Sequence, residues 1–218
     1  SVVSQLTSAV SLATQGNNGT LNASDLQSIG NQLTGIRDEV LSLANTTYLG
    51  RYIFSGSLGS TTPYTLSGST SPAVATYQGD TNVQYLKTPN GQQIQLNLPG
   101  SQVFSASGAD VLGTLNALIA DFSAGTTSAT SQADAQALNT ALSHVTQQRV
   151  LLDNSLSRLQ GAQSYNQSET TQLTSAQTTL LQADVGQIAT QLSTSETQQA
   201  ALIQVIATLG KQNLFNNL

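Results

Sequence analysis

The feature that most constrains this sequence is an apolar repeat at helical spacing near its carboxyl end. Seven apolar residues, named here the apolar stripe, share one heptad register in which Ser195 and Gln199 fill the two remaining positions. A helix from Gln172 to Leu214 would be roughly 65 Å long at about 1.5 Å per residue. A chain of 218 residues cannot easily bury such a helix, so we expect the stripe to pack against helices from outside this sequence or from other subunits. The stripe consists of Leu181, Val185, Ile188, Leu192, Leu202, Ile206 and Leu209.

Two helices are predicted near the amino end. Six apolar residues at alternating intervals of three and four indicate a helix from Asp25 to Thr47. A shorter helix with Leu6, Val10 and Ala13 precedes it, and the polar run Gly16 to Thr20 separates the two. The six residues of the longer helix are Leu26, Ile29, Leu33, Ile36, Val40 and Leu43.

Two more helices are predicted after residue 108. A short one begins at Asp110 and ends at a loop from Ser123 to Ser131. A long one follows, in which six apolar residues share a heptad register and Arg149 fills the register position between Val145 and Leu152. We expect this helix to pair with the Leu26 to Leu43 helix as a coiled-coil-like hairpin. A polar stretch from Gln160 to Ser168 then precedes the helix of the apolar stripe. The six residues are Leu138, Leu142, Val145, Leu152, Leu156 and Leu159.

The region between Gly56 and Gly108 has the character of β-structure. It contains all four prolines and short runs in which apolar and polar residues alternate. Strands are predicted around Val74 and Thr76 and around Val83 and Tyr85. Asn90-Gly91 is predicted to form a tight hairpin turn, which needs positive φ at its centre, and Gly79-Asp80 a second turn. An all-β insertion of about 50 residues fits usual strand and turn lengths.

These patterns predict an α+β fold, in which an elongated helical bundle carries the all-β insertion and ends in a long carboxyl-terminal helix. We expect residues 1–56 and 108–170 to form the two parts of the bundle and residues 57–107 to form the insertion. Residues 171–218 would form an assembly helix.

Composition favours a protein that packs against other subunits. Charged residues make up 8% of the chain, against about 25% in a typical soluble protein, so few charges would be desolvated when subunits pack. The six basic residues are scattered, although binding to nucleic acid or anionic lipid needs clustered ones. The sequence has neither an apolar run of about 18 residues nor a cleavable signal pattern. We therefore expect neither nucleic acid nor a membrane as partner.

The residues needed for catalysis are not grouped by any motif. His144 is the single histidine, and a lone imidazole without a second ligand is predicted to be a surface or packing residue. Asp38 and Glu39 are adjacent and would point to different sides of a helix, which argues against a paired acid and base. We predict no catalytic residue, no metal ligand and no cofactor site, and hence no enzyme.

A resemblance to a known family is carried by residues 44–56, the motif block, which reads Ala-Asn-Thr-Thr-Tyr-Leu-Gly-Arg-Tyr-Ile-Phe-Ser-Gly. It resembles the block that closes the amino-side helices of the flagellar hook-associated protein 3 family in the flagellin superfamily. Pro63-Tyr64, the Tyr77 to Asp80 segment and Ile94 to Asn97 follow in the family's order, and the region from Arg149 to Val185 is similar to the carboxyl-terminal region of flagellins. The motif residues are Asn45, Thr46, Tyr48, Gly50, Arg51, Tyr52, Phe54, Gly56, Tyr77, Gly79 and Asp80.

The resemblance implies a flagellin-like fold and a structural subunit that joins the flagellar hook to the filament. It also implies export through the flagellar type III apparatus and an extracellular location on the bacterial flagellum. The implied partners are a neighbouring hook-associated protein, flagellin, copies of the chain itself and an export chaperone. The family's long amino-terminal helix, which pairs with the carboxyl-terminal one, is missing ahead of Ser1, so we expect this chain to be a fragment.

Two alternatives remain open from the sequence. The chain would be a filament-forming flagellin if it polymerised indefinitely, although the motif block favours the junction family. It would be a secreted glycan- or receptor-binding module if Tyr64, Tyr77 or Tyr85 of the insertion bound a ligand. The aromatic residues Tyr48 and Phe54, together with Tyr52, are predicted to pack between the bundle and the insertion rather than to form a carbohydrate platform.

Overall fold

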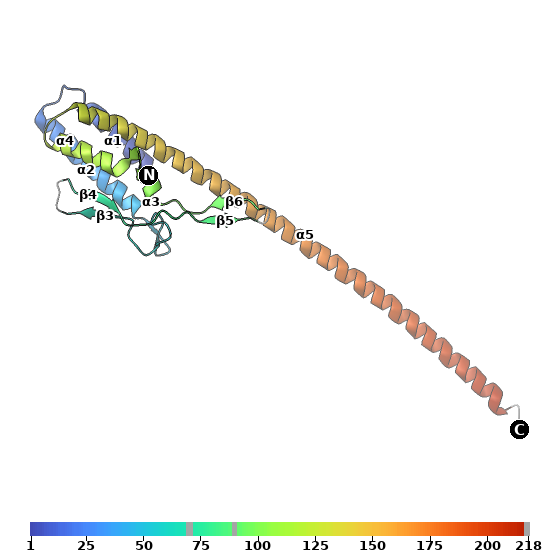
Figure 1. Cartoon of the computed structure of the whole chain (residues 1–218). Coiled ribbons are helices and arrows are strands. Elements are labelled where there is room, and N and C mark those ends of the chain that lie inside the picture. Colours follow the sequence, from blue (N-terminus) through green and yellow to red (C-terminus); the bar gives the residue numbers. More distant parts are fainter. Residues whose placement is uncertain (69–71, 89–90, 216–218) are drawn as a thin grey trace. The chain divides into compact units, whose positions relative to one another are not determined.

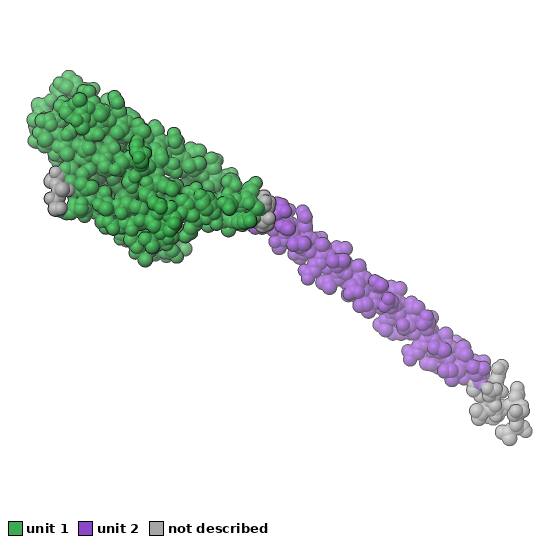
Figure 2. Space-filling model, in the orientation of Figure 1, with its two compact units in different colours: residues 1–160 green, residues 161–218 purple. Residues whose placement is uncertain are grey.

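The computed structural model describes residues 1–68, 72–88 and 91–215, with side chains as far as Leu209. The chain divides into two compact units, residues 1–160 and 161–218, which Figure 2 colours separately.

The longer helices of the first unit begin where the sequence supplies a capping side chain. These helices are α1 (Val2–Gly16), α2 (Ala23–Ala44), α4 (Val111–Ser123) and the first part of α5 (Ala129–Phe215), all visible in Figure 1. At the start of α2, Asn22 Oδ1 accepts a hydrogen bond of 3.0 Å from the Asp25 amide, and Asp110 Oδ1 accepts one of 2.9 Å from Gly113 at the start of α4. The four predicted helical segments are therefore present.

The predicted end of the α2 helix is three residues too late. The helix stops at Ala44, and the Thr46 carbonyl accepts a hydrogen bond from the Ile53 amide at 3.2 Å. This bond draws the chain into a hairpin, a tertiary feature that helical periodicity does not reveal.

The core of the first unit lies between the helices. Fully buried residues include Leu6 of α1, Leu33 of α2, Leu118 of α4 and Leu138 of α5. Helix α2 packs chiefly against α4 and α1. The coiled-coil-like hairpin expected between Leu26 to Leu43 and residues 138–159 does not extend over its whole length, because Leu152 and Leu156 are exposed.

A buried arginine reinforces the packing of α2 on α4. Arg37 is almost fully buried and donates hydrogen bonds to Asp38 Oδ1 at 2.8 and 3.0 Å and to Asn116 Oδ1 of α4 at 3.3 Å. A buried charge is tolerated only with such partners. The interaction with Asp38 gives this carboxylate a structural role.

The β region consists, in its described part, of separate two-stranded antiparallel hairpins rather than one sheet. The predicted strand at Val74 and Thr76 is present, and Tyr85 begins another strand, which Val83 precedes. Gly91 has φ +82°, as the predicted turn requires, whereas Asn90 lies outside the described residues. The strands are β1 (Thr47–Tyr48), β2 (Arg51–Tyr52), β3 (Tyr64–Ser67), β4 (Val74–Tyr77), β5 (Tyr85–Lys87), β6 (Gln93–Gln95), β7 (Ser105–Ala106) and β8 (Ala109–Asp110).

The insertion is not purely β, because a helical turn, α3 (Gly100–Val103), lies within residues 57–107. Its first residue is closely packed: the Gly100 amide donates to the Phe54 carbonyl at 2.7 Å, and a Cβ there would lie 2.9 Å from the Tyr64 ring. This turn is too short to give a periodic signal in the sequence.

Helix α5 is continuous over 87 residues. The polar stretch Gln160 to Ser168 does not interrupt it, since it lacks proline and its single glycine costs only about 1 kcal/mol in a helix. In the first unit, Leu138, Ala141 and Val145 are buried in the core, whereas Leu152 and Leu156 are exposed. Their shared heptad register therefore does not correspond to one buried seam.

Candidate assembly surfaces

The motif block turns the end of α2 into a hairpin whose tip is exposed. The central residues between β1 and β2, Leu49 and Gly50, have φ of 49° and 76°, and positive φ at both positions is typical of a type I′ turn. Tyr48 and Leu49 are 70% and 85% exposed. The prediction that Tyr48 packs between bundle and insertion is therefore wrong, and Tyr52 is only half-buried.

Asn45 fixes the end of α2 to the β region. Its Nδ2 donates to the Tyr64 carbonyl at 2.8 Å, and its Oδ1 accepts from the Tyr64 amide at 2.9 Å. One side chain thus satisfies both backbone polar groups of a residue at the start of β3, which would otherwise be costly to bury.

The Asp80 carboxylate organises the next turn of the motif. Its Oδ1 accepts hydrogen bonds from the Ser57 amide at 2.8 Å and the Asn82 amide at 3.0 Å, while the Ser57 hydroxyl donates to Oδ2. These bonds, chiefly those from Ser57, lower the pKa of Asp80 to about 2. Gly56 has φ +73°, and a Cβ at this residue would overlap the carboxylate and carbonyl oxygens of Asp80.

Tyr77 connects the two halves of the motif. Its hydroxyl lies 2.9 Å from the Phe54 carbonyl and 2.8 Å from the Asp80 carbonyl. A Cβ at Gly79 would overlap this hydroxyl, so the glycine leaves the space that the phenol occupies. Burial raises the pKa of Tyr77, so it stays a neutral donor at neutral pH. Tyr77 therefore has a structural role.

An aromatic cluster forms the contact between the insertion and the helices. Phe54 packs edge-on against Phe104 with ring centroids 5.1 Å apart, and Tyr64 contacts both Tyr77 and Phe104. Only Phe54 of the predicted cluster belongs to it. Tyr64 is 2% exposed, which leaves Tyr85 as the freely exposed tyrosine of the three considered for ligand binding.

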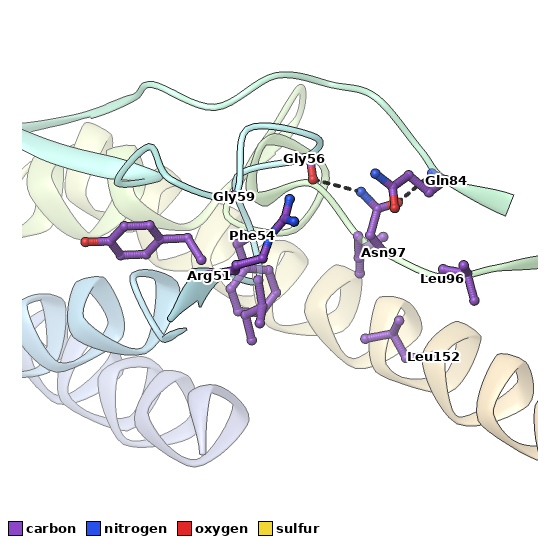
Figure 3. Close-up of a pocket in the computed structure, with 11 residues that line it drawn as sticks. Arg51, Phe54, Gly56, Gly59, Gln84, Leu96, Asn97 and Leu152 are labelled. Atoms are coloured by element: carbon purple, nitrogen blue, oxygen red, sulfur yellow. Dashed lines mark hydrogen bonds between the residues drawn. The ribbon is translucent and has the colours of Figure 1, made fainter. Parts of the chain in front are cut away.

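A hollow of about 480 Å³ lies beside the motif block (Figure 3). Asn97 spans it, donating to the Gly56 carbonyl at 3.2 Å and accepting from the Gln84 amide at 2.6 Å. Among the residues that line it, Arg51 carries the one charged side chain, and Tyr52 supplies a phenol. An acid, a base and a nucleophile are not combined here, so the hollow does not have the groups of an active site.

The apolar stripe lies in the second unit, on α5. Its seven residues are all exposed, by 52% to 66% of their surface, and their heptad spacing places them along one side of the helix. Full burial of one such side chain is worth roughly 1.5–3 kcal/mol. The stripe is therefore a large source of free energy available to a partner.

Several residues that hold the first unit together were missed in the sequence. Ser57, Asn82 and Asn97 bind the turns of the insertion, and no periodicity or motif distinguishes them from other Ser and Asn residues in this polar chain. His144 is half-buried, and its Nε2 lies 2.7 Å from the Gln102 carbonyl. Within residues 1–68, 72–88 and 91–215, no three acidic or histidine side chains gather to hold a metal.

No helix in the described part of the chain is both long and apolar enough to cross a membrane.

Comparison of the sequence with known proteins gives two curated relatives, and no family model matches. Flagellar hook-associated protein 3 of Escherichia coli K12 is 44% identical over 69 residues, which cover 29% of this chain and 22% of that protein. Flagellar hook-associated protein 3 of Salmonella typhimurium LT2 is 32% identical over 111 residues, covering 49% and 33%. The matches thus span between a fifth and a third of these relatives.

Comparison of the fold with solved structures leads to flagellar proteins named FlgL. FlgL of Xanthomonas campestris superposes with a TM-score of 0.65 at 18% identity, over 82% of this chain and 90% of that one. The flagellar junction protein FlgL of Legionella pneumophila gives a TM-score of 0.64 at 13% identity, over 77% and 85%. The resemblance to flagellar hook-associated protein 3 and the α+β fold with a long carboxyl-terminal helix, both predicted from the sequence, are confirmed.

Proposed function

We propose that this chain, which resembles flagellar hook-associated protein 3 in sequence and FlgL in fold, is a structural subunit that joins the flagellar hook to the filament. The observation that carries the proposal is the agreement of two separate comparisons, one of sequence and one of fold. The curated relatives are named as hook-associated proteins. The chemistry of the described residues, which form hydrogen-bonded turns rather than a catalytic group, supports a structural and not an enzymatic role.

The proposed mechanism is coupled folding and assembly. Side chains of residues 163–209 are exposed throughout, so this part of α5 gains little burial to offset the entropy lost when it is ordered. In the flagellum, neighbouring helices would cover Leu181, Ile188 and the other stripe residues and order the segment. The long helix would thus act as the joining element.

The proposed partners are flagellar subunits: a neighbouring hook-associated protein, flagellin and further copies of this chain, with an export chaperone before assembly. The proposed location is the extracellular flagellum. We also propose that the chain is divided into a bundle (1–56 and 108–170), an insertion (57–107) and an assembly helix (171–218). The motif residues would then position the insertion on the bundle.

The two alternative functions are less well supported. The relatives are named hook-associated or junction proteins, which disfavours a filament-forming flagellin. A glycan-binding insertion is disfavoured because Tyr64 is buried and the Tyr77 hydroxyl is held by backbone carbonyls.

Complementation tests the proposal. The gene that contains this sequence would be expressed in a flagellated strain that lacks its own hook-associated protein 3, and filaments on hooks would be counted by electron microscopy. We expect filaments to be restored. Normal secretion without filaments would contradict the junction role.

A pair of matched variants tests the stripe in the same strain. Ile188→Asp with Leu192→Asp places two charges within the apolar stripe, and we expect it to abolish filaments without reducing secretion, because burying an unpaired charge is costly. The control, Thr190→Asp with Thr197→Asp, adds the same charge on the opposite side of the helix and should keep filaments. Equal behaviour of the two variants would refute the stripe as the assembly surface.

A further inference from the structure

The side of α5 that carries the apolar stripe extends toward the amino end through three threonines. Thr171, Thr174 and Thr178 continue the same heptad register, and each hydroxyl donates to the carbonyl four residues earlier, at 2.9, 2.8 and 2.9 Å. Because these hydroxyls are already satisfied, a helix packed here would meet their methyl groups without leaving a buried donor unpaired. The extended stripe therefore runs over residues 171–209.

The period of the extended stripe indicates the shape of its partner. A strict seven-residue repeat drifts by about 20° per heptad around a straight α-helix. Such a stripe stays in contact with a second helix if the two helices supercoil around each other. Against a flat surface, the same stripe would rotate out of contact along the helix. The partner is thus expected to be a helix.

Charges beside the extended stripe restrict the chemistry of that helix. Asp184 precedes the stripe residue Val185, and Glu196 follows Ser195, so both lie in the positions that flank the seam of a coiled coil. Glu169, by contrast, falls in the register position that faces away from the stripe. Residues 161–209 contain these three acids and no lysine or arginine, so the flanks carry one sign of charge.

We infer that the extended stripe binds a helix that carries lysine or arginine beside its own apolar seam, opposite Asp184 and Glu196. A second copy of the same segment would bring no cation to these positions and would add three negative charges. This inference rests on the proposed assembly role and specifies the partner. Charge complementarity at such flanking positions sets partner choice between helices.

Two designed peptides of about five heptads test the inference. Both have leucine and isoleucine at the seam; one has lysine at every flanking position and the other glutamate, so that each repels copies of itself. Binding to the full chain would be measured by fluorescence anisotropy at low and at high salt. We expect the lysine peptide to bind about fivefold more tightly or better at low salt, with a smaller ratio at high salt.

Charge-reversal variants separate local pairing from overall attraction. Asp184→Lys with Glu196→Lys should reverse the preference toward the glutamate peptide. The control, Glu39→Lys with Glu169→Lys, changes the net charge equally at exposed positions away from the stripe flanks and should keep the preference for the lysine peptide. Equal effects of the two double variants would overturn the inference.

Self-association would also overturn it. Sedimentation equilibrium of the full chain that showed dimers through this segment, lost in Ile188→Asp with Leu192→Asp, would identify a second copy as the partner. The peptide assay needs no filament, so its result is independent of complementation. Restored filaments without a peptide preference would refute only the charge inference, and a peptide preference without filaments would refute only the junction role.

Discussion

Two glycines among the motif residues act by leaving space rather than by making contacts. Gly56 and Gly79 lie where a side chain would overlap Asp80 and the Tyr77 hydroxyl. Gly50 also has positive φ, but a Cβ there would meet nothing within 4 Å. The first two glycines are therefore needed for close approach, whereas Gly50 is needed only for the backbone conformation of its turn.

Alanine substitution should distinguish these two reasons. Gly50→Ala should cost about 1 kcal/mol of unfolding free energy, the penalty of a left-handed conformation alone. Gly56→Ala should cost about 3 kcal/mol or more, because the methyl group also displaces Asp80 from its hydrogen bonds. Urea unfolding followed by circular dichroism measures both values. Equal losses would show that the Asp80 turn adapts freely.

At the scale of elements, α5 combines two kinds of helix surface in one continuous helix. Near its start, Leu138 and Ala141 are completely buried against the first unit. From residue 163 to residue 209 every side chain is exposed. Apolar residues at heptad spacing are therefore buried in the first part of α5 and exposed to solvent in the second.

The same substitution in both parts should reveal this difference. Leu138→Ala should lower the unfolding free energy of the first unit by about 2–5 kcal/mol, since it leaves a cavity in a packed core. Leu181→Ala should change it by no more than about 0.5 kcal/mol, as for other exposed positions. Thermal unfolding at several chain concentrations would measure both. A large effect of Leu181→Ala that grows with concentration would instead reveal self-association.

At the scale of the whole molecule, the two units draw their stability from different sources. The first has a core made of residues from α1, α2, α4 and α5 together with the aromatic cluster. The second is a stretch of helix with an exposed apolar stripe, and helices without tertiary packing are only marginally stable in water. The second unit should therefore open far more often than the first.

Limited proteolysis with thermolysin, which cleaves beside apolar residues, tests this expectation on the dilute chain. Cleavage should occur first within residues 163–209 and leave a resistant fragment close to residues 1–160, because local opening exposes the backbone. Mass spectrometry would locate the cuts. First cleavage within the core residues of α1 or α4 would contradict it.

Helical periodicity predicted much of the fold because it reflects burial along one side of a helix. The helices of the first unit and the apolar stripe follow from residues such as Leu26, Leu138 and Leu181. Periodicity says nothing about which helix covers which, so the pairing of α2 with α4 was missed. The helical turn at Gly100 was missed because four residues contain no repeat.

The sequence by itself determined the helices, the positive φ of Gly91 and the family resemblance, since these depend on local spacing and on residue identity. The tertiary structure alone decided that Asp80 collects its bonds from Ser57 and that Tyr64 is buried whereas Tyr48 is exposed. Such features depend on contacts between residues far apart in the chain, and the polar side chains that make them are indistinguishable in sequence from those that face water.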